Sequence, residues 1–254
     1  MAKDLFSKQS DLYARYRPTY PKKLYDYIVS FVKEKNIAWD CATGNGQAAV
    51  ILSDYFKKVI ATDISAAQID KAIKKDNIEY GVCAAESTPF AENTFDLVTV
   101  AQAYHWIKWD EFKKEVTRVC KHDAVIAVWV YYNHTTGDKK VDNAIHDFYK
   151  NVTGSYWDYE RKFVEEMYST VDFNYELLPV KNFETILEWQ REDMIGYISS
   201  WSAIQKYIKV NGNSPVPAIE EEIKKIWPED EMKKVVFPIY LKLGRVLKSG
   251  TLAI

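Results

Sequence analysis

The sequence predicts an α/β fold built around a doubly wound parallel sheet, and two observations support this. A short apolar run, Ile37–Cys41, leads through a Gly44-x-Gly46 turn into a helix-forming segment, and this strand–turn–helix order is typical of nucleotide-binding folds. Strand and helix patterns then alternate across residues 37–131, the arrangement that gives a parallel sheet. The 254 residues are enough for one large domain of this kind.

Ahead of this sheet, the sequence predicts an extended segment followed by a helix. Pro18 and Pro21 favour extended or turn backbone, and Pro21 also suits the first turn of a helix. Apolar residues recur at helical spacing across residues 24–32. The Tyr and Arg side chains before this helix either reach over a ligand or pack on the core, and spacing alone does not separate the two.

The glycine turn fits two different cofactors. With Ala49 in the third place after Gly44 and Gly46, it meets the looser dinucleotide fingerprint. Asp40 points the other way, because a carboxylate so close to the turn would repel a pyrophosphate. The same carboxylate could hold the ammonium group of S-adenosylmethionine (SAM). A buried acid that only caps the turn is the remaining alternative.

A second acid, Asp63, ends the next predicted strand, residues 59–63. It follows Gly46 by 17 residues, close to the roughly 20-residue offset at which an acid binds ribose hydroxyls in dinucleotide folds. One carboxylate can accept hydrogen bonds from both ribose hydroxyls, so an acid is the chemically suitable residue. Ser65 can then cap a helix that buries Ile69 and Ile73.

The strongest candidate for a central strand is Phe95–Ala101, which is apolar and rich in β-branched residues. A strand is expected before it at residues 78–83, and a helix and a strand after it at residues 108–121 and 124–131. The central strand runs into polar and aromatic residues at 102–106. Ligands bind at this carboxyl edge in open α/β sheets.

Composition narrows the class of protein. The formal net charge of -2 and the pI near 6.1 give no reason to expect nucleic acid or a membrane as partner. The polar N-terminal residues do not resemble a signal peptide, and no segment has the apolar length of a membrane span. The 3 cysteines lie far apart without metal-ligand spacing. We therefore expect a cytoplasmic monomer or weak dimer without a bound metal.

Six stretches occur along the chain in a characteristic order. They are residues 13–21, 40–46, 63, 85–90 and 101–106, together with the downstream pair 200–207 and 237–245. In this order and spacing the chain resembles a class I SAM-dependent methyltransferase with a methyltransferase type 11 domain. The resemblance covers nearly the whole chain and is greatest to the trans-aconitate methyltransferase-like branch.

The resemblance implies a seven-stranded Rossmann-like sheet with an antiparallel last strand and helical cap insertions. In a single domain of residues 1–254 we expect four parts. These are an N-terminal lid and first helix at 1–35, a SAM-binding core at 36–132, a mainly helical substrate cap at 133–232, and the last strand at 233–254.

Within the cap, alternating apolar and polar residues at 183–189 predict a sixth strand that returns to the sheet. Apolar residues at helical spacing predict cap helices at 141–149, 163–168 and 195–208, and residues 211–215 predict a loop.

The resemblance also implies which residues bind the methionine end of SAM. Asp40 would hold the ammonium group, and the Ala101 carbonyl would meet it from the other side. Tyr13 and Arg17 would close over the carboxylate, through a charge-assisted contact in the case of Arg17. The other residues of this set are Ala42, Gly44, Gly46 and Trp106, whose aromatic face suits a sulfonium.

At the nucleoside end, the resemblance places Asp63 on the ribose hydroxyls and Ile64 on the face of the adenine. Ala85 and Glu86 fall where such enzymes bind the adenine edge. Ala84 stands where these enzymes often carry an acid, so main-chain contacts would have to recognise the adenine.

For the chemistry itself, alignment matters more than a reacting side chain, because methyl transfer is an in-line displacement. A carboxylate acceptor needs no base. For a hydroxyl or amine acceptor, His105 is the candidate general base, and otherwise it only lines the pocket. The predicted substrate pocket consists of Tyr104, His105, Tyr131, Tyr132, Tyr197 and Trp201.

Three functional hypotheses follow. The first is a SAM-dependent methyltransferase acting on a small molecule, with a carboxylate as the favoured acceptor and S-adenosylhomocysteine (SAH) as the product. The second is an NAD(P)-dependent oxidoreductase that uses the Gly44/Gly46 turn. The third is a SAM-fold binding protein without turnover.

Overall fold

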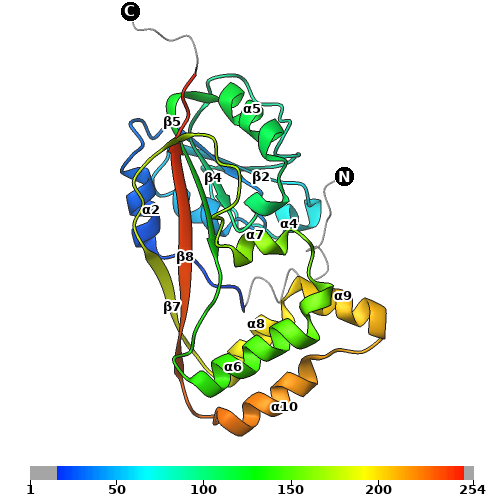
Figure 1. Cartoon of the computed structure of the whole chain (residues 1–254). Helices are drawn as coiled ribbons and strands as arrows, with labels where there is room; N and C mark the ends of the chain where they lie inside the picture. Colours follow the sequence, from blue (N-terminus) through cyan, green and yellow to red (C-terminus); the bar gives the residue numbers. More distant parts are fainter. Residues whose placement is uncertain (1–15, 249–254) are drawn as a thin grey trace, which may run out of the picture.

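The structure, a computed structural model, describes residues 16–248 and contains the predicted α/β sheet (Figure 1). Its strands follow the order β3-β2-β1-β4-β5-β8-β6, and β7 pairs with β8. Strands β1 to β5 are parallel to one another. They span Ile37–Cys41, Lys58–Asp63, Ile78–Val82, Phe95–Ala101 and Cys120–Tyr131.

The remaining strands confirm the expected antiparallel ending of the sheet. β8 (Lys233–Arg245) runs antiparallel between β5 and β7 (Phe183–Trp189). β7 is the strand expected from alternation at residues 183–189. The described residues form eight strands rather than seven, because the short β6 (Glu176–Leu177) pairs with the end of β8.

Helices cover both faces of the parallel part of the sheet. α2 (Lys22–Val29) and α3 (Gln47–Leu52) pack on the face that carries Leu97 of β4. α5 (Trp109–Val119) packs on the opposite face with Val98. Adjacent β4 residues thus point to opposite faces, and both faces are buried, which explains the nearly continuous apolar run. The short α4 (Ala66–Asp70) follows β2.

The segment between β5 and β8, which contains the predicted cap, is called the cap below. Its α-helices are α6 (Lys139–Asp147), α7 (Arg161–Glu165), α8 (Arg191–Ser199), α9 (Ser202–Asn211) and α10 (Val216–Ile226). A π-helical turn, Phe148–Val152, and a 3-10 turn, Gly154–Tyr156, separate α6 from α7. In Figure 1, α6, α8, α9 and α10 gather beyond the end of the sheet near the start of β8.

The structure corrects one prediction for the cap and adds one helix that the sequence analysis did not predict. The single helix expected over residues 195–208 is two helices, because Trp201 has an extended backbone with φ -70° and ψ 137°. The backbone N–H of Ser200 donates to the carbonyls of Gly196 and Tyr197, which closes α8 before this break. Helix α10 was not expected, although Val216, Ile219 and Ile223 recur at helical spacing and are buried.

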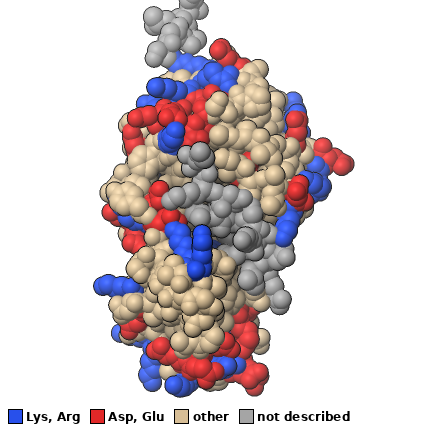
Figure 2. Space-filling view, turned by 90° about the vertical axis from the view of Figure 1, so that its right-hand side faces the viewer, with Lys and Arg blue, Asp and Glu red and all other residues tan. Residues whose placement is uncertain are grey.

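The charged surface is mixed on the face drawn in Figure 2. Among the coloured residues, Lys and Arg alternate with Asp and Glu rather than forming a continuous basic surface. Between residues 16 and 248, every helix is too short or too polar to span a bilayer. The division of the chain into lid, core and cap stays a prediction.

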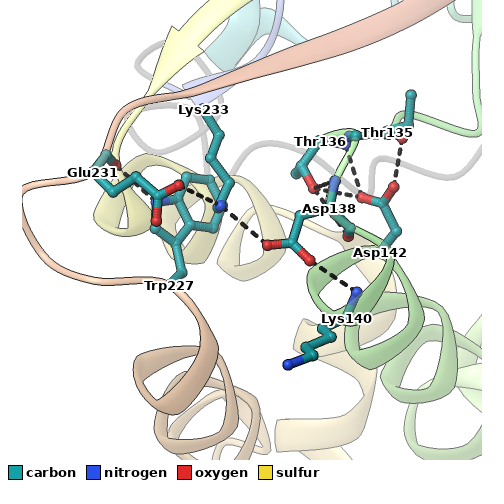
Figure 3. A network of polar contacts seen from close by, with 9 residues as sticks. Thr135, Thr136, Asp138, Lys140, Asp142, Trp227, Glu231 and Lys233 are labelled. Atoms are coloured by element: carbon teal, nitrogen blue, oxygen red, sulfur yellow. Dashed lines mark hydrogen bonds and ion pairs between the residues drawn. The ribbon is translucent and has the colours of Figure 1, made fainter.

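A polar network fastens the beginning of the cap to the beginning of β8 (Figure 3). Asp138 caps α6 by accepting a hydrogen bond from the Lys140 backbone N–H at 2.9 Å. Its other oxygen accepts from Lys233 Nζ at 3.1 Å, and Lys233 also contacts Glu231 at 2.7 Å. Only 10% of the Lys233 side chain is exposed, and it lies over the buried Trp227 ring. The Asp138 carboxylate thus caps the start of α6 and also binds the nearly buried ammonium of Lys233.

Replacing Asp138 by alanine is expected to lower the free energy of unfolding by about 1–2 kcal/mol, because it removes both the helix cap and one Lys233 partner. Chemical denaturation followed by circular dichroism measures this change. Lys140→Ala is the matched control, since the exposed Lys140 contributes only its backbone N–H to the network. Equal stability of both variants and the wild type would contradict the role of the network.

Candidate active site

A cavity of about 250 Å³ opens at the carboxyl ends of the first four strands. Residues following β1, β2, β3 and β4 form its walls, as expected for an open α/β sheet. Eight of the residues predicted to bind a cofactor lie on these walls: Ala42, Gly44, Asp63, Ile64, Ala85, Glu86, Ala101 and Trp106. Motifs that are far apart in the sequence thus meet around one space.

The other four predicted cofactor residues lie elsewhere. Asp40 and Gly46 are not on the cavity wall, and Asp40 is fully buried at the end of β1. Arg17 lines a smaller neighbouring pocket. Tyr13 lies outside the described residues.

The glycine turn has its conformation for steric reasons. Gly44 and Gly46 have φ of +59° and +87°, a region that glycine enters without penalty. A Cβ on Gly46 would lie 2.3 Å from the Tyr80 hydroxyl, whereas a Cβ on Gly44 would meet only Gln68 at 3.9 Å. Gly46 is therefore required for packing beneath the turn, and Gly44 leaves the backbone open to the cavity.

Asp63 holds the turn in place. One carboxylate oxygen accepts a hydrogen bond from the Gly44 backbone N–H at 2.9 Å, and the other accepts from the Ser65 N–H at 2.8 Å. The end of β2 is thereby fixed to the loop after β1. Because Asp63 also lines the cavity, it can meet a ligand from the same position.

Asp40 is a buried acid with two hydroxyl partners. The hydroxyls of Thr43 and Thr99 donate to its two oxygens at 2.5 Å and 2.7 Å. Burial raises the pKa of Asp40 to about 6, although these hydrogen bonds oppose the shift. A positive group bound above the turn would favour the charged form of this carboxyl.

The cavity is acidic. Among its described lining residues the charged side chains are Asp63, Glu86 and Glu160, with no Lys or Arg. Glu86 also accepts a hydrogen bond from the Lys108 backbone N–H at 3.0 Å, beside the start of α5. Such walls suit a cationic cofactor such as SAM and repel the pyrophosphate of NAD(P). The observed charge therefore disfavours the oxidoreductase hypothesis.

A second pocket of about 50 Å³ adjoins the cavity and shares Gln102 and Trp106 with it. Its walls include three residues of the predicted substrate pocket, His105, Tyr131 and Tyr197. Arg17 also lines it, together with four cap residues, Trp157, Asp158, Arg161 and Ser202. The position beside the cavity is suitable for the molecule that receives a group from the cofactor.

The other predicted substrate residues pack behind this pocket. Tyr104 is buried, and its hydroxyl donates to the Asp172 carbonyl at 2.8 Å. Tyr132 packs against Tyr149 with ring centroids 6.2 Å apart. Trp201 is buried among aromatic rings of the cap. These three side chains support the pocket walls rather than forming them.

His105 is a poor general base in this setting. It is 8% exposed, and its Nδ1 lies 2.8 Å from the Tyr168 hydroxyl. Burial, with a smaller contribution from the Arg161 charge, lowers the pKa of His105 to about 3. An imidazole with so low a pKa is a weak base, so it removes a proton from an acceptor inefficiently at neutral pH. This favours the alternative in which His105 only lines the pocket.

Arg161, at the start of α7, was not expected from the sequence. Its Nε donates to the Tyr149 hydroxyl at 2.8 Å, and its guanidinium lies 4.5 Å from the Trp157 ring centroid. No acidic side chain among residues 16–248 forms an ion pair with it. The aromatic neighbours hold the guanidinium in place without neutralising its charge.

A second guanidinium, that of Arg17, lies on the same pocket. Its Nη2 donates to the Ser200 carbonyl at 2.9 Å, and its centre lies 5.3 Å from the Tyr197 ring centroid. The acid on the pocket wall, Asp158, forms an ion pair with Lys206 at 2.5 Å. Among the described residues that line this pocket, two guanidiniums therefore face one carboxylate, in contrast to the acidic lining of the cavity next to it.

Comparisons with known proteins show the family to which the chain belongs. Residues 39–128 match the family model described as "Methyltransferase domain". A Dictyostelium discoideum protein named "Putative methyltransferase" is 34% identical over 249 residues, 95% of either chain. A solved structure from Anaeromyxobacter dehalogenans, named a "Putative Type II Methyltransferase", has a TM-score of 0.83 and 31% identity over 91% of this chain and 98% of that one. The similarity thus extends through the cap as well as the core.

Proposed function

Because this chain belongs to the class I SAM-dependent methyltransferases, we propose that it methylates a carboxylate of a small anionic acceptor to form an O-methyl ester. SAM supplies an electrophilic methyl group on a positively charged sulfur. The protein has to bind the two reactants, align them and exclude water.

The cofactor is assigned to the acidic cavity. Asp63 lies on the cavity wall and is assigned to the ribose hydroxyls, and Ala85 and Glu86 lie on the wall where the adenine edge is expected. Asp40 would act on the ammonium group from beneath the turn, through its charge and its bonds to Thr43 and Thr99. This arrangement fits the net positive charge of SAM.

The observation that carries the proposal of a carboxylate acceptor is the pair of guanidiniums on the adjoining pocket. Arg17 and Arg161 both line it, and Asp158, the one acid among its described lining residues, is paired with Lys206. Guanidinium groups match carboxylates in charge and geometry. The resemblance to the trans-aconitate branch points to the same class of acceptor.

The state of His105 supports the same proposal. With a pKa near 3, its imidazole is badly matched to removing a proton from a hydroxyl or an amine. A carboxylate is already deprotonated at neutral pH and attacks without a base.

The experiment is an acceptor screen with SAM labelled on the methyl group. Small mono-, di- and tricarboxylic acids are each tested beside the corresponding amide and alcohol. We expect label to enter only carboxylic acids and to be released as methanol by mild alkali. Transfer to amides or alcohols, with none to any carboxylic acid, would overturn the proposal.

Cofactor binding should depend on pH through Asp40. Its pKa of about 6 in the free protein means that lowering the pH below that value protonates the carboxylate that favours a bound ammonium. SAH affinity is therefore expected to be full above about pH 7 and to fall by up to about tenfold per unit below pH 6. Calorimetric titrations across this range measure the profile.

Asp40→Asn provides the control for this pH dependence. Asparagine keeps the shape but has no charge to lose, so the variant should bind SAH weakly and with no dependence on pH. A wild-type affinity that stays constant between about pH 5 and pH 7 would contradict the role given to Asp40.

A further inference from the structure

We propose that Glu160, a cap residue, lies beside the sulfur of the cofactor and makes the cavity prefer SAM over SAH. The two ligands differ at this sulfur, which is a cationic sulfonium in SAM and a neutral thioether in SAH. A carboxylate held near it would stabilise the substrate form selectively. The inference rests on the proposed placement of the cofactor in the acidic cavity and of the acceptor in the adjoining pocket, and it does not depend on the chemical identity of the acceptor.

The position of Glu160 follows from its neighbours. Glu160 lines the cavity, whereas the next residue, Arg161, lines the adjoining pocket. The two spaces share Gln102 and Trp106, so this pair of cap residues lies at their junction. The methyl group has to pass from one space to the other, which places the sulfur at the same junction.

The segment that carries Glu160 is fastened to that junction. Phe163 of α7 packs edge-on against Trp109, with ring centroids 4.9 Å apart. Just beyond α7, the buried Tyr168 contacts His105 Nδ1 through its hydroxyl at 2.8 Å. Both contacts join the cap to the residues that follow β4. Both contacts lie C-terminal to Glu160, and they hold the helix that Glu160 precedes against the residues that follow β4.

The Glu160 carboxylate is available to a ligand. Within residues 16–248 it takes part in no hydrogen bond and no ion pair, and no Lys or Arg of the described chain lines the cavity around it. The nearest guanidinium along the chain, Arg161, is engaged by Trp157 and Tyr149 at the other pocket. A cationic ligand would thus be the natural partner of this acid.

The physical effect is selective because only one ligand carries the charge. A charge pair several Å apart in a partly exposed cleft is only moderately screened. Removing the carboxylate should weaken binding of SAM about tenfold and leave SAH within about twofold. In the wild type, the same difference would keep the product from competing strongly with the substrate.

The test is a calorimetric comparison of the wild type with Glu160→Gln. Three ligands are used: SAM, SAH, and sinefungin, which carries a protonated amine where SAM carries its methylated sulfur. We expect the variant to lose about tenfold in affinity for SAM and for sinefungin while SAH binds as before. Retained SAH binding also shows that the variant is folded.

Glu166→Gln is the matched control, because Glu166 is an exposed acid at the end of the same helix. Its SAM-to-SAH affinity ratio should equal that of the wild type. An unchanged ratio in Glu160→Gln, or equal losses for all three ligands, would overturn the role of Glu160. A wild-type protein that binds none of them would instead overturn the cofactor site together with this inference.

Discussion

Replacing Asp63 by alanine is expected to weaken SAH binding about 100-fold, as measured by isothermal titration calorimetry. The carboxylate accepts hydrogen bonds from the backbone N–H groups of Gly44 and Ser65 and lines the cavity where the ribose is assigned. Its loss removes the ribose acceptor and loosens the glycine turn. Hydrogen bonds to a charged group contribute about 1.5–3 kcal/mol each, which is consistent with a loss of about 3 kcal/mol in binding.

Two further variants make this result specific. Asp63→Asn keeps one acceptor oxygen and the size of the side chain, so its affinity should fall between those of the wild type and Asp63→Ala. Asp70→Ala removes an exposed acid from the nearby helix α4 and should bind as the wild type does. Unchanged affinity in Asp63→Ala would show that the cofactor is placed wrongly.

Replacing Arg161 by glutamine is expected to lower kcat/KM for a carboxylate acceptor about 100-fold and leave SAH affinity unchanged. The guanidinium lies on the small pocket, held by Trp157 and Tyr149 and without an ion-pair partner among the described residues. A charged, bidentate contact to a carboxylate is lost in the variant. Steady-state kinetics and SAH titration on the same preparation provide both numbers.

The lysine variant separates charge from geometry. Arg161→Lys keeps a positive charge but cannot form the planar two-point contact, so its kcat/KM should be intermediate. Thermal unfolding of both variants reports any loss of packing against the aromatic rings. If Arg161→Gln uses the carboxylate acceptor as well as the wild type does, the acceptor does not bind at this guanidinium.

The parallel sheet could be predicted because its information is local. Phe95–Ala101 is apolar because β4 is covered on both faces, and such a run identifies a central strand without knowledge of its neighbours. The alternation that predicted β7 is local information of the same kind. This edge strand is buried on one face only, so it exposes Glu184 and buries Thr185.

The break between α8 and α9 could not be predicted in the same way. The break occurs at Ser200 and Trp201, where the sequence has no glycine or proline to signal the end of a helix. Apolar residues continue on both sides. The ring of Trp201 packs on Tyr197 and on Trp157, so the break depends on a contact with a distant part of the cap. Such tertiary contacts override local periodicity.

Some residues of the candidate site could be predicted from local sequence, and others depend on how the cap folds. Asp63 and Ala101 are the last residues of β2 and β4, and Gly44 follows β1, so topology alone brings them to one edge of the sheet. Glu160 and Arg161 reach the two pockets only because the cap folds back over that edge. Their neighbouring sequence, rich in aromatic and charged residues, does not differ from an ordinary surface segment.

The most direct test of the cofactor assignment is a calorimetric titration of the wild-type protein with SAH, run in parallel with NAD. We predict one SAH bound per chain with a dissociation constant on the order of micromolar. We predict no heat of binding with NAD, because the cavity-lining residues within 16–248 include three acids and no Lys or Arg. Absence of SAH binding, or saturable binding of NAD, would contradict the assignment of the acidic cavity to SAM.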